Sequence, residues 1–117
     1  CVVDADGLRV VIDRPSLVRD CTWTVVTPNK PEYARLLQAF RPTPPTTQAR
    51  EPPPESDELE HIALSRALAG PVVVRKGATD LVSDGAIICV NTEPGCPKRS
   101  GGQGDVLAGS IAAFLGW

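Results

Sequence analysis

A glycine-rich segment near the end of the sequence has the residue types and spacing of an anion-binding loop. Gly101, Gly102 and Gly104 precede an apolar, helix-forming stretch, and Asp105 follows them directly. Glycines let a backbone approach an anion closely, and the free N–H groups of a helix's first turn attract negative charge. A carboxylate beside a bound anion suits proton transfer or metal binding. The segment therefore predicts either a catalytic anion-binding loop or a glycine-rich turn whose aspartate caps the helix.

Other segments carry groups that suit phosphate chemistry. Asn29 and Glu32 have the spacing of a capping box, which is sufficient without any metal, but the same pair could help to place a metal ion and a phosphate. Lys76 follows an apolar strand and precedes a glycine, so it is either a phosphate contact or a solvated lysine. Lys98 and Arg99 stand just before the glycine-rich segment and are either phosphate contacts or plain surface charge.

A few polar and aromatic residues receive less specific interpretations. Asp4 and Asp6 follow the first apolar run, where open α/β sheets place their binding crevices, so they are turn formers or site-lining residues. His61 lies inside a helical pattern far from any motif and is interpreted as incidental. Trp23 and Trp117 are interpreted as packing residues.

Alternating strand and helix patterns predict the fold class. Apolar runs predict strands at residues 1–3, 22–27 and 72–74, and Asp84-Gly85 predicts a hairpin over 81–88. Helical patterns cover residues 8–17 (broken at Pro15), 29–40, 56–70 and 105–115. The order of these elements predicts an α/β fold with a mostly parallel sheet, flanked by helices and carrying one antiparallel hairpin.

The apolar spacing also predicts which helix faces are buried. The first set, in the helix over 29–40, is Tyr33, Leu36, Leu37 and Phe40. The other sets are Leu59, Ile62, Ala63 and Ala67 in the helix over 56–70, and Val106, Leu107, Ile111, Phe114 and Leu115 in the last helix.

Composition excludes several classes of protein. The 117 residues carry a net charge of −2 with dispersed basic residues, which argues against a nucleic-acid partner. No apolar run approaches the roughly 20 residues of a membrane-spanning helix. Four cysteines without a C-x-x-C pair indicate buried or incidental reduced thiols, which weakly favours a cytosolic or organelle-matrix setting. The proline-dense residues 41–55 predict a surface loop insertion.

The motifs together resemble the ribokinase-like superfamily, and within it the ATP-dependent NAD(P)H-hydrate dehydratases. The likeness rests on Thr27-Pro28-Asn29-x-x-Glu32, Lys76-Gly77, Gly95-x5-Gly101-Gly102-Gln103-Gly104-Asp105 and Asp4-Ala5-Asp6-Gly7-Leu8. It spans the chain except for the proline-rich insertion. The glutamine at position 103 is similar to what the eukaryotic, ATP-using members carry at this position of the motif. The resemblance implies a ribokinase-like fold, incomplete at both ends, in which residues 1–117 form the C-terminal part of a single domain.

The resemblance also implies roles for individual residues. Asp105 matches the catalytic base, and the backbone of Gly102, Gln103 and Gly104 matches the anion hole for the transferred phosphoryl group. The residues that match a substrate-binding segment are Asn29, Lys30, Pro31, Glu32, Tyr33, Ala34 and Arg35, with Asp105 added. Those that match nucleotide-binding segments are Lys76, Gly77, Ala78, Thr79 and Asp80, and Gly95, Cys96, Pro97, Lys98, Arg99, Ser100, Gly101, Gly102, Gln103 and Gly104. Glu32 is the candidate metal residue, acting through water.

The implied activity is repair of hydrated NADH or NADPH. The resemblance implies that ATP, with Mg²⁺, phosphorylates the C6 hydroxyl and that phosphate is then eliminated, which makes the enzyme a lyase. The alternatives are a small-molecule kinase of the same superfamily and an inactive nucleotide-binding fragment. We expect a cytoplasmic protein, with a mitochondrial location open for its full length, and little activity from the 117 residues alone. The oligomeric state is left open.

Overall fold

The computed structural model describes residues 1–40, 56–98 and 100–117, and it contains one five-stranded mixed sheet. The strands lie side by side in chain order: β1 (Val2–Val3), β2 (Val25–Val26), β3 (Val72–Arg75), β4 (Asp80–Ser83) and β5 (Ile88–Asn91). The first three are parallel, whereas β4 and β5 continue the sheet in antiparallel fashion. The predicted α/β class and the predicted hairpin are both confirmed. The strand expected over 22–27 is shorter, because residues 22 and 23 form a turn.

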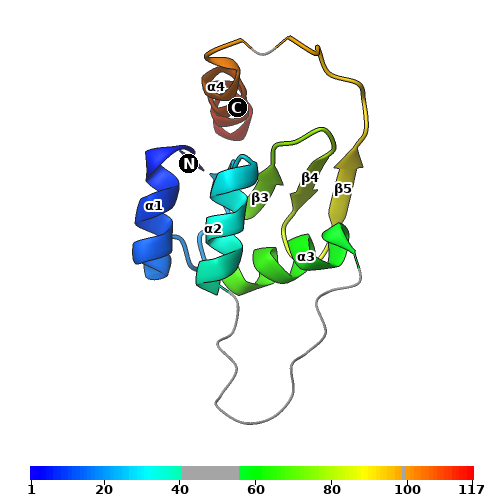
Figure 1. Ribbon diagram of the computed structural model, residues 1–117. Helices are drawn as coiled ribbons and strands as arrows, with labels where there is room; N and C mark the ends of the chain where they lie inside the picture. The colour runs from blue at the N-terminus through cyan, green and yellow to red at the C-terminus, as the bar shows by residue number, and fades with distance from the viewer. Residues whose placement is uncertain (41–55, 99) are drawn as a thin grey trace.

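Helices cover one face of the parallel strands. They are α1 (Asp6–Asp13), α2 (Lys30–Phe40) and α3 (Asp57–Leu68), with a short 3-10 helix, Pro15–Leu17, after α1. Side chains of all three helices share one hydrophobic core with β2 and β3, centred on Leu8, Leu36, Leu68, Val26 and Val73. The fourth helix, α4 (Gln103–Gly116), stands apart from these three at the opposite end from α3 (Figure 1).

The hairpin turn has a local cause for its conformation. Gly85 has φ of 93°, a backbone conformation that favours glycine, and an added Cβ there would meet the backbone of Arg66 at 3.0 Å. Asp84 Oδ1 accepts hydrogen bonds from the amides of Ala86 and Ile87, at 2.8 and 2.9 Å. The Asp-Gly signal in the sequence therefore corresponds to a turn with specific contacts.

The buried face of α3 differs from the prediction. His61, Leu64, Ser65 and Leu68 are buried, whereas Leu59 is 52% exposed. The predicted face and the buried face both have helical spacing. Hydropathy favoured the predicted face because the buried face contains the polar residues His61 and Ser65, whose polar groups form hydrogen bonds inside the protein. Ser65 Oγ donates to the His61 carbonyl oxygen at 2.9 Å.

His61 is the centre of a buried hydrogen-bond network. Its Nε2 lies 3.1 Å from the Val73 carbonyl oxygen and its Nδ1 lies 3.2 Å from the Tyr33 hydroxyl. A carbonyl only accepts, so Nε2 carries the proton and Nδ1 accepts from Tyr33. Burial lowers the pKa of His61, which keeps the ring neutral. The interpretation of His61 as incidental is therefore wrong, because it joins α2, α3 and β3.

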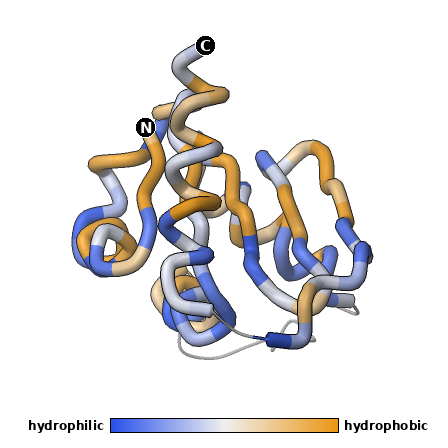
Figure 2. The backbone as a smooth tube through the Cα atoms, turned by 90° about the horizontal axis from the view of Figure 1, so that it is seen from above, coloured by the Kyte–Doolittle hydropathy of each residue, from blue (hydrophilic) through white to orange (hydrophobic). Residues whose placement is uncertain are grey.

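The apolar side of α4 is also more exposed than predicted. Gly104, Ala108, Ile111 and Leu115 are partly buried and α4 contacts β1. Residues predicted to be buried are largely exposed, namely Val106, Leu107 and Phe114. Figure 2 shows hydrophobic segments along this projecting helix.

Several smaller expectations are settled by the same structure. Trp23 and Trp117 are 73% and 97% exposed, so neither is a packing residue within this chain. All four cysteines are exposed free thiols, so of the two expected alternatives, buried or incidental, the buried one is wrong. No helix in the described ranges is long and apolar enough to cross a membrane. The insertion predicted over 41–55 lies outside the described residues.

Candidate active site

The loops that follow the three parallel strands meet at one edge of the sheet. Asp4 follows β1, Thr27 follows β2 and Lys76 follows β3. The Lys76 amide donates to the Pro28 carbonyl oxygen at 2.9 Å, which fixes the second and third loops side by side. Parallel strands present their carboxyl ends at the same edge, where α/β proteins place ligand sites. Figure 1 shows the start of the last helix above this edge.

An ion pair joins the first and third of these loops. Lys76 Nζ donates to Asp4 Oδ1 at 2.8 Å, and the two side chains are only 21% and 18% exposed. Burial raises the pKa of the Asp4 carboxyl, but hydrogen bonding by Lys76 and Thr27, with the Lys76 charge, brings that pKa below its ordinary value. The Thr27 hydroxyl is buried and has no partner of regular hydrogen-bond geometry among the described residues. Asp4 is therefore ionised beside an ammonium group and a buried hydroxyl.

The glycine-rich segment lies against this ion pair. A Cβ atom placed on Gly104 would be 3.5 Å from Lys76 Nζ and 3.6 Å from Asp4 Oδ2. Gly102 is the N-cap of α4 and has φ of 82°, which favours glycine. The amides at the start of α4 and the Lys76 ammonium group are thus neighbours. This arrangement suits an anion, because helix N-termini and cations both attract one.

Asp105 lies in the first turn of α4 and is exposed. Its side chain makes no hydrogen bond or ion pair with another residue in the parts of the chain that the structure describes. An exposed carboxylate one residue after Gly104 is free to accept a proton from a bound hydroxyl.

Asn29 and Glu32 form the capping box that their spacing predicted. The Asn29 amide donates to Glu32 Oε2 at 2.8 Å, and the Glu32 amide donates to Asn29 Oδ1 at 3.0 Å. Each side chain therefore satisfies a free donor at the start of α2. Glu32 retains its second carboxylate oxygen, so the cap leaves an oxygen for a further ligand.

Residues 76–79 connect β3 to β4, and Asp80 is the first residue of β4. The Gly77 amide donates to Asp80 Oδ1 at 2.8 Å, and Asn91 Nδ2 donates to Asp80 Oδ2 at 3.3 Å. These two hydrogen bonds of Asp80 stabilise the conformation of the loop. Of the predicted residues 76–80, Lys76 has its side chain beside the glycine-rich segment, next to Gly104.

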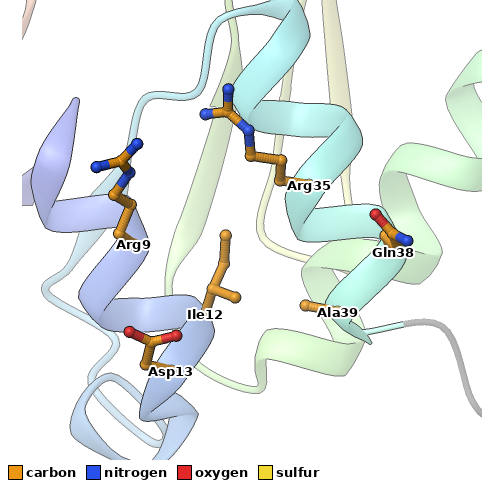
Figure 3. Close-up of a pocket in the computed structure, with 6 residues that line it drawn as sticks. All are labelled: Arg9, Ile12, Asp13, Arg35, Gln38 and Ala39. Atoms are coloured by element: carbon orange, nitrogen blue, oxygen red, sulfur yellow. The ribbon is translucent and has the colours of Figure 1, made fainter.

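A groove of about 470 Å³ separates α1 from α2, and Arg9 and Arg35 lie on its two sides (Figure 3). Ile12 lies between these helices. An adjoining hollow of about 150 Å³ shares Arg9 and Arg35 and reaches Ala5 and Glu32 at the helix starts. Among the residues predicted to bind substrate, Arg35 lines both hollows. Neither hollow is lined by Lys76 or Gly104.

The remaining predicted site residues do not all gather at this edge. Tyr33 is only 4% exposed and faces the core, so its predicted substrate contact stays a prediction. Gly95 to Lys98 are exposed, and Gly101 would have no neighbour within 4 Å of an added Cβ. Arg99 lies outside the described residues. Asp4 was expected only as a site-lining residue, and its pairing with Lys76 was missed because 72 positions separate the two in sequence.

Comparisons with known proteins show the family to which the chain belongs. Residues 1–117 match the NAD(P)H-hydrate dehydratase family, Carb_kinase. Similar proteins include one from Neurospora crassa, 46% identical over 99% of this chain and 32% of its own length, and one from Ixodes scapularis, 43% identical over 99% and 35%. A protein from Arabidopsis thaliana is 38% identical over 99% of this chain and 30% of its own length. All three are named ATP-dependent (S)-NAD(P)H-hydrate dehydratase.

Each match covers nearly all of this chain but only part of the relative. The chain spans about a third of the length of these curated relatives, although it is matched almost from end to end. The family match covers the loops after all three parallel strands and the glycine-rich start of α4. This chain belongs to the NAD(P)H-hydrate dehydratase family.

Proposed function

We propose that the protein containing this chain is an ATP-dependent dehydratase of hydrated NADH and NADPH. The names of the similar proteins support this activity. The structural observation that carries it is the position of Gly104, which lies beside the Lys76–Asp4 ion pair and one residue before Asp105. An anion-binding helix start, a cation and a free carboxylate are the groups that phosphoryl transfer to a hydroxyl requires.

The proposed chemistry assigns one task to each group. The oxygen of the C6 hydroxyl attacks the γ-phosphorus of ATP, and ADP departs. Asp105 accepts the proton that this hydroxyl loses. The amides of Gln103 and Gly104, with the Lys76 ammonium group, stabilise the charge on the transferred phosphoryl oxygens. Phosphate then leaves C6 and the ring loses a neighbouring proton, which restores the dihydronicotinamide. Phosphorylation makes a hydroxyl into a good leaving group, which accounts for the use of ATP.

The donor set fits Mg²⁺ that arrives with ATP rather than a resident metal. Among residues 1–40, 56–98 and 100–117, no three His, Cys, Asp or Glu side chains gather closely enough to hold a metal ion. Mg²⁺ characteristically keeps several waters and takes one or two carboxylates plus substrate phosphates. Glu32, with one carboxylate oxygen outside its cap, would supply such a contact through water. The bound ion would neutralise charge on the ATP phosphates.

The other binding assignments are proposed from the resemblance of their motifs to the family. Residues 29–35 would bind the hydrated dinucleotide, with Arg35 reaching it from the groove between α1 and α2. Residues 76–80 and 95–104 would bind ATP. The location of residues 1–117 within a single larger domain and the low activity expected of these residues alone remain predictions.

The test uses the full-length protein, hydrated NADH or NADPH, and ATP. We expect ATP-dependent recovery of dihydronicotinamide absorbance and release of ADP and phosphate in equal amounts. Asp105→Asn should lower kcat by about 10²- to 10⁴-fold and leave ATP affinity nearly unchanged, because a general base is lost while the anion site remains. Glu58→Gln is the matched control, since Glu58 is an exposed acid in the first turn of α3. A near wild-type rate for Asp105→Asn would remove Asp105 from the reaction.

A further inference from the structure

The ion pair between Asp4 and Lys76 indicates a role for a residue that the motifs left unassigned. We infer that Asp4 is a positioning residue, which holds the Lys76 ammonium group at the start of α4 where the transferred phosphoryl group would bind. This inference rests on the proposed function. The inference concerns what holds the Lys76 ammonium group beside the start of α4, whereas the proposed function concerns which reaction takes place at that site.

The geometry leaves Lys76 a single described partner. Its Nζ donates to Asp4 Oδ1 at 2.8 Å, and no other side-chain hydrogen bond or ion pair of Lys76 is formed within the described residues. A Cβ on Gly104 would lie 3.5 Å from the same Nζ atom. Asp4 is therefore the group that determines where the ammonium group lies relative to α4.

Asp4 is itself held firmly. It directly follows β1, and its carbonyl oxygen accepts a hydrogen bond from the Gly7 amide at 3.0 Å as α1 begins. Its side chain is 18% exposed. A lysine side chain is a flexible four-carbon stem and adopts many rotamers when it is free. A fixed carboxylate reduces those rotamers to the ones that place Nζ beside Gly104.

The ion pair also leaves Lys76 able to bind an anion. An ammonium group has three N–H donors, and Asp4 Oδ1 accepts one of them. The remaining donors are available to phosphoryl oxygens. The buried Thr27 hydroxyl lies close enough to lower the pKa of Asp4 and has no regular partner of its own. The polar groups around Asp4 therefore keep the carboxylate ionised, as positioning of a cation requires.

The test is a double-mutant cycle in the full-length protein with Asp4→Asn, Lys76→Gln and both together. We expect Asp4→Asn to lower kcat on the order of 10²-fold, because a displaced group near the reacting atoms has effects of that size, while KM for hydrated NADH stays unchanged. We expect the double variant to match Lys76→Gln alone, since Asp4 acts through Lys76. A wild-type kcat for Asp4→Asn, or a further fall of kcat in the double variant, would overturn the inference.

A matched control is available one residue before Lys76. Arg75 Nη1 lies 3.2 Å from Asp57 Oδ2, and the Asp57 side chain is 78% exposed. Asp57→Asn removes a carboxylate from the neighbouring cation and should leave kcat unchanged. If Asp4→Asn alone does not fold, because it leaves an ammonium group without its partner, a kcat of the double variant below that of Lys76→Gln would still overturn the inference.

A spectroscopic measurement separates this inference from the proposed function. In protein with ¹⁵N-labelled lysine, the Nζ resonance of Lys76, identified by its loss in Lys76→Gln, should be that of an immobilised ammonium group. We expect Asp4→Asn to abolish this resonance and Asp57→Asn to leave it unchanged. If the wild-type protein did not turn over hydrated NADH, the proposed function would be wrong, while loss of the resonance would still support positioning. Its persistence in Asp4→Asn would overturn the inference whatever the activity.

Discussion

Gly104 is the residue of the glycine-rich segment whose lack of a side chain has a specific consequence. An added methyl group would lie 3.5 Å from Lys76 Nζ and 3.6 Å from Asp4 Oδ2, distances of ordinary contact, and the backbone there is helical. Gly104→Ala should therefore fold normally but obstruct the approach of a phosphoryl group. We expect kcat/KM of the full-length enzyme to fall on the order of 10²-fold, with an unchanged or higher Tm.

The control for this substitution is in the same helix. An added Cβ on Gly109 would meet nothing within 4 Å. Gly109→Ala should retain full activity and stabilise the helix by up to about 1 kcal/mol, because alanine has the higher helix propensity. Equal activity of the two variants would show that the phosphoryl group does not bind beside Gly104.

Individual site residues were predictable where their partners are close in sequence. The capping box of Asn29 and Glu32 was predicted from a three-residue spacing, and both of its hydrogen bonds are present. The pair of Asp4 and Lys76 was not predictable in the same way, because only the parallel order of β1, β2 and β3 brings the two together. A local pattern contains no information about which strands are neighbours.

At the scale of elements, α3 packs on the sheet with the face that carries His61, Leu64 and Leu68, and not with the face that hydropathy selected. We expect His61→Ala to lower the free energy of unfolding by about 2–4 kcal/mol, because it leaves a cavity and removes the partner of the Tyr33 hydroxyl. Leu59→Ala should lower it by less than about 1 kcal/mol, since Leu59 is 52% exposed. Urea unfolding measures both values. A larger loss for Leu59→Ala than for His61→Ala would show that Leu59, and not His61, packs in the core.

Elements themselves were predicted well, and their buried faces less well. The strands after residue 71, the hairpin and the four helices lie close to their predicted places. The predicted face of α3 was wrong, whereas in α4 the predicted Ile111 and Leu115 are partly buried and Val106, Leu107 and Phe114 are exposed. Helical spacing alone does not determine which face another element packs against. In α3, buried His61 and Ser65 are polar residues whose partners come from their own helix and from other elements.

At the scale of the whole molecule, His61 gives stability a defined dependence on pH. Burial lowers the pKa of His61 in the folded state, so the unfolded chain binds the extra proton more readily. Stability is therefore complete above the ordinary histidine pKa of about 6.5 and falls as pH decreases below it. His61 is the one histidine among the 117 residues.

The measurement is the free energy of unfolding at about pH 7.5 and about pH 5, where histidine is the side chain that ordinarily titrates. His61→Gln should be less stable than the wild type at the higher pH, but its stability should change less between the two values. Equal pH dependence in both proteins would contradict a neutral buried His61.

The ion pair across the sheet also links the position of Lys76 to assembly of the sheet. Asp4 and Lys76 directly follow the first and third strands in the chain order of the sheet, and Thr27, which directly follows the intervening strand, lies near the carboxylate. The lysine is thus immobilised only in molecules in which all three strands have already come together. Nascent or partly unfolded chains would leave it untethered, and we expect them to consume no ATP before the native sheet exists.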